Sequence, residues 1–298
     1  MTLPAAFGDW VGTVQADVEQ ALGALLPGAG AAPARLHAAM RYAVLGGGKR
    51  VRPLLVYAAG AMFGAELPAL ARAAAAVEMI HAYSLVHDDM PCMDDDALRR
   101  GKPTVHVAYD EATALLVGDA LQAQAFMVLA HEQTLPAARQ LAMLRVLAGA
   151  AGSNGMCGGQ AIDLASVGVA LDLEQLEQMH QLKTGALLGA SVLLGALAGR
   201  DVTGDERAAL DAYSSAIGLA FQVVDDVLDA TADSATLGKT AGKDAAANKP
   251  TYVSILGLEA SQRLAHTLRR AAHDALAPFG DKALRLRELA DLIVQRKA

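Results

Sequence analysis

Cysteine and aromatic residues are scarce in this chain of 298 residues. The two cysteines, Cys92 and Cys157, provide no disulfide framework, which suits a reducing compartment and predicts a cytoplasmic protein. Phe, Trp and Tyr together make up 4% of the residues although 53% are hydrophobic, so most of the apolar mass is Ala, Leu and Val. That composition favours closely packed helices over a β-sandwich.

Basic residues and long apolar runs are missing at informative places. No Lys or Arg precedes Arg35, so the N-terminal stretch lacks the cationic start of a signal or transit peptide. The longest uncharged apolar stretch, Gly185–Gly199, is shorter than the ~20 residues that span a bilayer, and we expect it to be a core helix. A net charge of −7 argues against a general nucleic-acid surface. We therefore expect neither a membrane span nor a nucleic-acid partner.

Helical periodicity runs through nearly the whole chain. It predicts helices over residues 5–25, 34–46, 51–63, 68–90, 109–131, 136–152, 172–198, 204–230, 250–277 and 281–296. A break near Lys183 is compatible with the pattern, and Ser166–Leu171 is a short strand candidate. Thr203 and Glu206 match a capping box at the start of one helix. Because no repeat or low-complexity linker divides the chain, residues 1–298 are predicted to form a single all-α domain.

Two acidic clusters stand in this apolar helical sequence. They are Asp88-Asp89-Met90-Pro91-Cys92-Met93-Asp94 and Asp225-Asp226-Val227-Leu228-Asp229. Burying an unpaired carboxylate is costly, and neighbouring carboxylates also repel one another. A hard divalent cation offsets that repulsion, and oxygen-only ligands favour Mg²⁺, which usually shares its coordination with substrate phosphates. The clusters predict an enzyme that handles a phosphorylated substrate.

The spacing within the two clusters differs. At ~100° per residue, Asp225 and Asp229 fall on one helical face, while Asp226 points to the side. In the first cluster an ideal helix would leave Asp88 and Asp94 roughly 120° apart and would favour Asp95 instead. Because Pro91 disrupts the helical hydrogen bonds, we expect the helix to unwind after Asp89, which would let Asp94 swing back. The choice between Asp94 and Asp95 stays open at this point.

Basic residues gather at three places, which predicts a local anion site in an acidic protein. The groups are Lys49 with Arg50 and Arg52, Arg99 with Arg100 and Lys102, and Lys239 with Lys243 and Lys249. Arginine forks hold phosphate in bidentate geometry, and the start of a helix also favours anions. The third group lies in the polar segment Ser234–Lys249, which we interpret as a functional loop or lid. We expect the C-terminal Arg296 and Lys297 to belong to the same lid.

These motifs together resemble those of the trans-isoprenyl diphosphate synthases, and they occur in family order. The first aspartate-rich motif runs from His81 to Pro91 and continues with Arg99-Arg100-Gly101. The others are Gly47-Gly48-Lys49-Arg50-Val51-Arg52-Pro53, Gly118-Asp119-Ala120, Gly159-Gln160-Ala161-Ile162-Asp163-Leu164, Lys183-Thr184 and Phe221-Gln222-Val223-Val224-Asp225-Asp226. Within the family, the chain looks most like the bacterial enzymes that make farnesyl diphosphate.

The resemblance implies the isoprenoid synthase fold, with helices around a deep central cavity, and a homodimer. It implies that isopentenyl diphosphate is joined to an allylic diphosphate with the help of Mg²⁺, and it assigns residues to each task. The assigned metal residues are Asp88, Asp89, Asp94, Asp225, Asp226 and Asp229. The allylic diphosphate would be held by Arg99, Lys183 and Lys239, and isopentenyl diphosphate by Lys49, Arg52, His81 and Arg100. Thr184 and Gln222 would be polar groups of the cavity, and Lys249 would belong to the lid, although Asn248 departs from the glycine of many members.

Product length is expected to depend on Tyr83, with Ser84 beside it. Both precede Asp88 by more than one turn, or roughly 6–7.5 Å along a helix. A prenyl chain that grows down this wall would be stopped by the Tyr83 ring. The resemblance favours a C15 product, with geranyl and geranylgeranyl diphosphate as alternatives.

Three other classes of protein explain these motifs less well. Glu78-Met79-Ile80-His81 and Glu177-Gln178-Met179-His180 resemble the Glu-x-x-His elements of di-iron helical bundles, but that class leaves the aspartates and cations unexplained. A non-catalytic partner subunit would tend to lose one acidic motif, and both are complete here. A terpene cyclase would not need a separate isopentenyl site.

Overall fold

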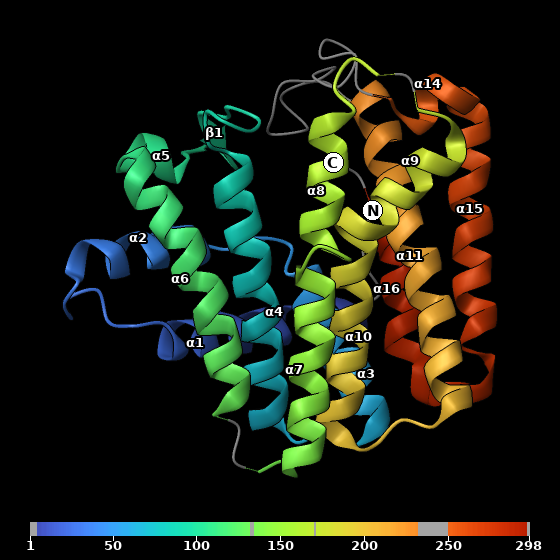
Figure 1. Cartoon of the computed structure of the whole chain (residues 1–298). Coiled ribbons are helices and arrows are strands. Elements are labelled where there is room, and N and C mark those ends of the chain that lie inside the picture. The colour runs from blue at the N-terminus through green and yellow to red at the C-terminus, as the bar shows by residue number, and fades with distance from the viewer. Residues whose placement is uncertain (1–4, 132–133, 170, 232–249, 297–298) are drawn as a thin grey trace. The chain divides into compact units, whose positions relative to one another are not determined.

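A computed structural model describes residues 5–131, 134–169, 171–231 and 250–296. The described residues are almost entirely helical, and the only strands among them form one two-residue-long hairpin, so the all-α prediction is confirmed (Figure 1). The chain forms two compact units. The N-terminal unit comprises residues 4–147 and 194–201, and the C-terminal unit comprises residues 1–3, 148–193 and 202–298.

The N-terminal unit is built from α1 to α6, the hairpin and parts of two further helices. These elements are α1 (Ala5–Leu25), α2 (Ala34–Val44), α3 (Val51–Phe63), α4 (Leu67–Asp88), β1 (Leu98–Arg99), β2 (Lys102–Pro103), α5 (Val105–Ala108) and α6 (Glu111–Ala130), with the beginning of α7 (Ala137–Ala151) and the end of α10 (Ala186–Gly199). Helix α4 is buried on most of its circumference, as expected for a core helix that is apolar all round. It runs beside α6 (Figure 1).

Close approach of α4 and α6 depends on a glycine. A Cβ atom at Gly118 on α6 would overlap the imidazole ring of His87 on α4. The same ring nitrogen, His87 Nε2, lies 3.1 Å from the carbonyl oxygen of Leu115. Helix α6 is capped by Asp110, whose side chain accepts the backbone N–H of Thr113 at 2.6 Å. The end of α4, which carries the first acidic cluster, is therefore packed tightly against α6.

The C-terminal unit is built around α11. Its other elements are α8 (Met156–Ala165), α9 (Leu173–His180), a π-helix (Gln181–Gly185), the beginning of α10, α14 (Tyr252–Leu256), α15 (Leu258–Ala275), a 3₁₀ segment (Ala277–Ala283) and α16 (Leu284–Gln295); α11 itself spans Gly204–Thr231. The expected capping box is present, because Thr203 N–H donates to Glu206 and Glu206 N–H donates to Thr203. Helix α15 lies along α11 (Figure 1).

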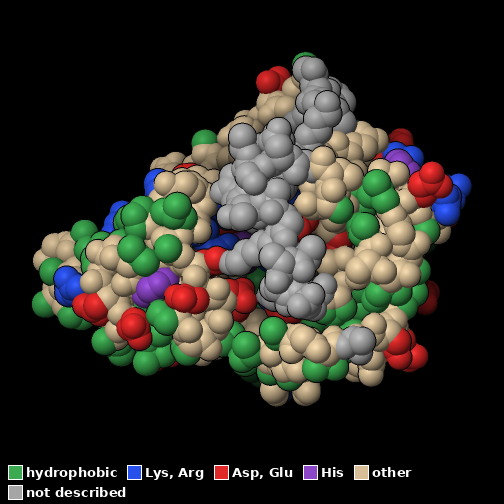
Figure 2. All heavy atoms as spheres, turned by 90° about the horizontal axis from the view of Figure 1, so that it is seen from above, with side chains coloured by type: hydrophobic (Ala, Val, Ile, Leu, Met, Phe, Trp, Pro, Cys, Tyr) green, Lys and Arg blue, Asp and Glu red, His purple; other side chains and the backbone are tan. Residues whose placement is uncertain are grey.

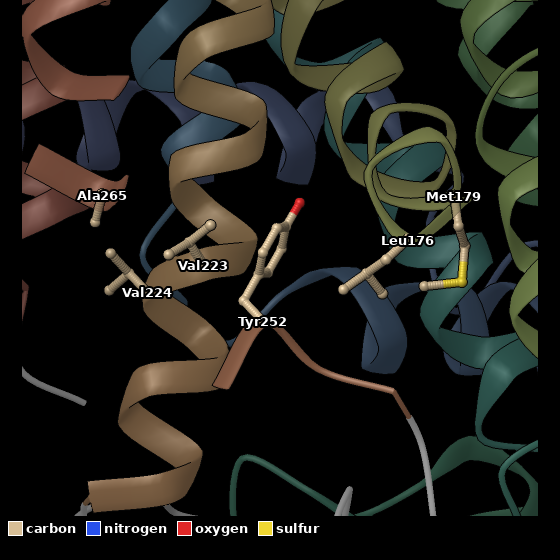
Figure 3. Packing of buried hydrophobic residues seen from close by; sticks show 6 residues of the cluster. All are labelled: Leu176, Met179, Val223, Val224, Tyr252 and Ala265. Carbon is tan, nitrogen blue, oxygen red and sulfur yellow. The ribbon is translucent and has the colours of Figure 1, made fainter. Parts of the chain in front are cut away.

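The core of this unit closes around Tyr252. Figure 3 shows its ring between Val223 of α11 and Leu176 and Met179 of α9, and the side chain is fully buried. Tyr252 opens α14 through a capping box formed by Thr251 and Ser254. Packing therefore holds the start of α14 against α11 and α9.

The sequence located most helices but missed some local structure. The ranges 5–25 and 51–63 match α1 and α3 at both ends, and the break near Lys183 is confirmed as a π-helix. Helix α8 was not predicted, and the range 250–277 is divided at Gly257, whose φ is 83°. The strand candidate at residues 166–171 was wrong for its described residues, which form a turn and irregular chain after α8.

Three helical stretches are long and apolar enough to cross a membrane, namely Leu67–Asp88, Glu111–Ala130 and Leu173–Gly199. In the most apolar 18 residues of the first and third stretches, 78% and 72% are buried inside the protein, so these apolar residues contribute to the core. In Glu111–Ala130 the buried share is 44%, because Leu115, Leu116 and Met127 face outward. The absence of a membrane span stays a prediction.

Candidate active site

The first acidic cluster begins where α4 ends. After Asp89 the chain turns at Pro91 and folds back, so that Asp94 N–H donates to the carbonyl oxygen of Asp88 at 2.9 Å. The expected unwinding after Asp89 is thus confirmed. Asp95 is exposed and left-handed, with a φ of 50°, whereas Asp94 is half-buried. This geometry favours Asp94 over Asp95 as the partner of Asp88.

Asp89 is held by an arginine from the hairpin. Arg99 Nε donates to both carboxylate oxygens of Asp89, at 2.9 and 2.8 Å. The Asp89 side chain is only 5% exposed. Burial raises the pKa of Asp89, and the Arg99 guanidinium opposes that rise. A residue assigned to the metal and a residue assigned to the allylic diphosphate therefore form an ion pair in this structure.

A cavity of about 110 Å³ lies next to this ion pair within the N-terminal unit. Its walls include Asp89 and Arg99 together with His81, Arg100 and Lys102. Burial lowers the pKa of His81 well below its usual value, and the nearby guanidinium groups lower it further, so this imidazole is neutral at pH 7. The cavity thus combines carboxylate, cationic and neutral hydrogen-bonding groups.

The triple glycine before α3 wraps around Arg100. Gly46, Gly47 and Gly48 all have positive φ values, and Arg100 Nη1 donates to the carbonyl oxygen of Gly47 at 2.9 Å. A Cβ atom at Gly48 would overlap the Arg100 guanidinium. The loop therefore brings Lys49 and Arg52, at the start of α3, to the same part of the unit as Arg100. Lys49, Arg52, His81 and Arg100 were all assigned to isopentenyl diphosphate.

The second acidic cluster lies within the continuous helix α11. Asp225 Oδ1 forms an ion pair with Arg296 Nη2 at 2.6 Å, and Arg296 stacks 3.8 Å from the ring centroid of Phe221. Asp226 is buried, and its Oδ2 accepts the backbone N–H of Tyr252 at 2.7 Å. Asp229 is also buried. The side chain of Asp225 is 43% exposed, so it is the accessible member of this cluster.

The predicted polar residues of the cavity meet in the C-terminal unit. Thr184 Oγ1 donates to Gln222 Oε1 at 2.8 Å, and Lys183 Nζ lies 2.6 Å from Asp163 Oδ2. Together with Asp226 these four residues line a cavity of about 150 Å³. Carboxylates and a cation share one cavity here, as they do in the N-terminal unit.

Two residues of this cavity were not predicted to belong to a diphosphate site. Asp163 belongs to the motif Gly159–Leu164, but no role was predicted for its side chain. In the structure it forms an ion pair with Lys183. The sequence feature that could have indicated this contact is Gly159 in the same motif. A Cβ atom at Gly159 would overlap the backbone of Lys183, so the motif and Lys183 lie close together. His180 also lines the cavity, and burial lowers its pKa to about 4.

Tyr83 and Ser84 lie on the buried face of α4. Tyr83 is 6% exposed, and its ring meets the His87 ring edge-on, with centroids 5.9 Å apart. Ser84 Oγ donates back to the carbonyl oxygen of His81 at 2.9 Å. Lys239, Lys249 and the remainder of the expected lid, Ser234–Lys249, lie outside the described residues, as does Lys297.

The helical architecture and these cavities define a class of helical protein in which carboxylates and cations line the same cavities. Among the described residues, no three or more His, Cys, Asp and Glu side chains gather into a metal site. Glu78, part of one Glu-x-x-His element, is instead in an ion pair with Arg50. The di-iron alternative therefore receives no support from Glu78.

Comparison with known proteins identifies the family. Residues 33–277 match the Polyprenyl synthetase family, and the chain belongs to it. A probable farnesyl diphosphate synthase from Bradyrhizobium diazoefficiens is 53% identical over 91% of this chain and 82% of its own length. The farnesyl diphosphate synthase of Escherichia coli is 49% identical, over 86% and 88% respectively. The crystal structure of an FPP/GFPP synthase from Zymomonas mobilis has a TM-score of 0.88 and 44% identity, covering 97% of this chain and 99% of that one.

Proposed function

We propose that this protein is a prenyltransferase that makes farnesyl diphosphate by head-to-tail (1'-4) condensation. It joins isopentenyl diphosphate first to dimethylallyl diphosphate and then to geranyl diphosphate. The names of the relatives above support this function. The structural observation that carries it is that, in each unit, one aspartate of an acidic cluster, Asp89 or Asp226, lines a cavity together with at least one cation. Diphosphate recognition with a divalent metal needs that combination.

The carboxylates fit Mg²⁺ by their donor chemistry. Mg²⁺ binds oxygen ligands only, and it is usually held by one or two carboxylates, several waters and substrate phosphates rather than by a complete protein cage. Asp88 and Asp94, with Asp89 nearby, would hold it from the first cluster, and Asp225, with Asp226 and Asp229 nearby, from the second. The bound metal would neutralise charge on the departing diphosphate.

The cations divide into two groups that orient two substrates. Arg99, Lys183 and Lys239 hold the allylic diphosphate, and Lys49, Arg52, His81 and Arg100 hold isopentenyl diphosphate. As the allylic C1–O bond breaks, its electron pair leaves with the diphosphate, and the double bond of isopentenyl diphosphate forms a new bond from C4 to C1. Loss of a proton from C2 of the isopentenyl unit to the released diphosphate restores the alkene. The dipoles of Thr184 and Gln222 face the carbocation.

A single domain and a homodimer belong to the same proposal. One family match extends over residues 33–277 and so includes sequence from both units, which supports one functional domain. The partner is a second copy of the chain, and the outward-facing Leu115, Leu116 and Met127 of α6 supply apolar surface for it. On the face of the protein shown in Figure 2, the described Lys and Arg side chains are scattered among Asp and Glu, which favours small anionic substrates over nucleic acid. Cys92 and Cys157, both exposed and free, suit the cytoplasm.

Product analysis tests the proposal. The protein is incubated with Mg²⁺, isopentenyl diphosphate and dimethylallyl diphosphate, and the dephosphorylated products are identified by mass. We expect C15 as the main product and no product when a chelator removes the metal. A main product of C10 or C20 would replace the farnesyl assignment with geranyl or geranylgeranyl, and metal-independent turnover would contradict the mechanism.

A further inference from the structure

Arg50 stands between two residues assigned to isopentenyl diphosphate, but its own side chain points to protein groups. Its Nε donates to Glu19 at 2.9 Å, its Nη1 donates to Glu78 at 2.6 Å, and its Nη2 donates both to Glu19 and to the carbonyl oxygen of Val44, the latter at 2.8 Å. These four bonds engage most of the five N–H groups of a guanidinium. Arg50 is therefore bound to the protein rather than prepared to bind a diphosphate.

The bonds of Arg50 connect the loop before α3 to three other helices. Glu19 belongs to α1, Val44 ends α2, and Glu78 belongs to α4. A second bond joins the same loop to α1, because Gln15 Nε2 donates to the carbonyl oxygen of Lys49 at 3.2 Å. Gln15 and Glu19, one turn apart on α1, thus hold the backbone of Lys49 and the side chain of Arg50.

The backbone at Arg50 needs this fixation. Its φ and ψ are 49° and 38°, the left-handed region that side chains other than glycine rarely occupy, and no side chain caps α3 there. Such a conformation persists when the surrounding structure determines it. The carboxylates of Glu19 and Glu78 hold Arg50 in this conformation. They thereby set the direction in which α3 leaves the glycine loop.

The charges are buried to different extents. The side chains of Arg50 and Glu78 are 3% and 4% exposed, whereas that of Glu19 is 34% exposed. Burial works against the charged guanidinium, but Glu78 and Glu19 outweigh it and raise the pKa of Arg50. Arg50 and Glu78 also line the same cavity as His81 and Arg100. The ion pair therefore forms part of the wall beside the proposed isopentenyl diphosphate groups.

We propose that Arg50, held by Glu78 and Glu19, is a positioning residue that places Lys49 and Arg52 for the diphosphate of the isopentenyl substrate. This inference rests on the proposed function. The three cations of the motif Lys49-Arg50-Val51-Arg52 then have two tasks, since the outer two contact substrate and the middle one fixes the loop. Glu78, a carboxylate in a cationic cavity, is explained as the buried partner of Arg50.

The test separates positioning from simple stability. Arg50→Met would leave the Glu78 charge buried alone, so it is compared with the double variant Arg50→Met/Glu78→Met, in which apolar side chains of similar length replace both charges. Glu19→Ala, at a more exposed position, removes two of the four bonds if the double variant does not fold. The KM values for isopentenyl diphosphate and for geranyl diphosphate are measured separately, beside the melting temperature.

We expect the folded variants to raise the KM for isopentenyl diphosphate by about 10-fold to 100-fold, the loss typical of removing a group that orients a ligand. The KM for geranyl diphosphate should stay unchanged. Arg41→Met is the matched control, because Arg41 is another arginine of this unit that donates to backbone carbonyls, of Gly23, Leu26 and Pro27, away from the cavity. It should lower stability without changing either KM.

Lys49→Ala distinguishes failure of the inference from failure of the proposed function. If Lys49→Ala raises the KM for isopentenyl diphosphate but the folded Arg50 and Glu19 variants do not, Arg50 is only structural and the inference is overturned. If Lys49→Ala itself leaves that KM unchanged, the isopentenyl assignment of this loop fails, and the inference fails with it. An equal rise in both KM values would also overturn a role specific to one substrate.

Discussion

The two acidic clusters have similar compositions but are built in different ways. The first lies beyond the end of α4, where Asp94 returns to Asp88 through a backbone hydrogen bond. The second lies inside α11, where the helix itself sets the direction of each carboxylate. In both clusters the structure shows an aspartate paired with an arginine. For Asp89 the partner is ten residues away, and for Asp225 it is 71 residues away at the C-terminus.

The clusters differ in how far along the chain their supporting residues lie. The turn, the hairpin and Arg99 that support the first cluster all come from one stretch of chain. The second cluster depends on distant segments, because Asp225 needs α16 and its following residue, and Asp226 needs the start of α14. The accessible Asp225 can exchange its partner more easily than the buried Asp89, whose charge has little water around it.

The largest expected effect comes from removing one carboxylate of either cluster. Asp88→Ala and Asp225→Ala should each lower kcat by about 10²–10³-fold or more, the loss typical when a group that stabilises transition-state charge is removed. Steady-state kinetics measure the loss, and circular dichroism checks the fold. Asp94→Ala should behave like Asp88→Ala, whereas Asp95→Ala, at an exposed position, should stay near wild type. Reversal of the last two results would make Asp95 the partner of Asp88.

The two arginine partners should differ in their contribution to stability. Arg99→Met leaves Asp89, 5% exposed, without its ion pair and should lower the free energy of unfolding by about 3–5 kcal/mol. Arg296→Met leaves Asp225, 43% exposed, in contact with water and should cost about 1 kcal/mol or less from the lost ion pair. Urea unfolding without metal measures both. Equal losses would contradict the contrast between the buried Asp89 and the accessible Asp225.

Helix packing behind the first cluster should tolerate no added methyl group. Gly118→Ala drives a Cβ atom into the His87 ring and should lower the free energy of unfolding by about 1–3 kcal/mol. Gly12→Ala in α1 is the matched control, since no atom lies within 4 Å of the added methyl, and it should stabilise the helix by up to about 1 kcal/mol. Thermal unfolding of both variants checks the prediction, which fails if they shift stability in the same direction.

Product length should change by one isoprene unit or more when the Tyr83 ring is removed. Tyr83→Ala removes the ring that lies more than one turn before Asp88 and should shift the products from C15 to C20 or longer. Tyr83→Phe keeps the ring and should still give C15. Mass analysis of the products decides between them. An active Tyr83→Ala variant that stops at C15 would show that Tyr83 does not limit the chain.

Periodicity predicted most of the helices, and the turn chemistry of Pro91 predicted the fold-back of the first cluster. It missed α8 because Gly155, Gly158 and Gly159 interrupt the apolar pattern that marks a helix. It also missed the β1–β2 hairpin, whose strands are too short to show alternation. Sequence spacing grouped Arg50 with Lys49 and Arg52, because only tertiary structure brings Glu19 and Glu78 to its guanidinium.

The central claim is that both acidic clusters are needed for Mg²⁺-dependent binding of a diphosphate, and a binding measurement tests it most directly. Calorimetric titration of the wild-type protein with an unreactive allylic thiodiphosphate, at saturating Mg²⁺, should show one metal-dependent site per chain. Asp88→Ala and Asp225→Ala, although they change different units, should each abolish that same binding event. If either folded variant keeps wild-type affinity and stoichiometry for the analogue, its cluster is not needed for diphosphate binding and the account is contradicted.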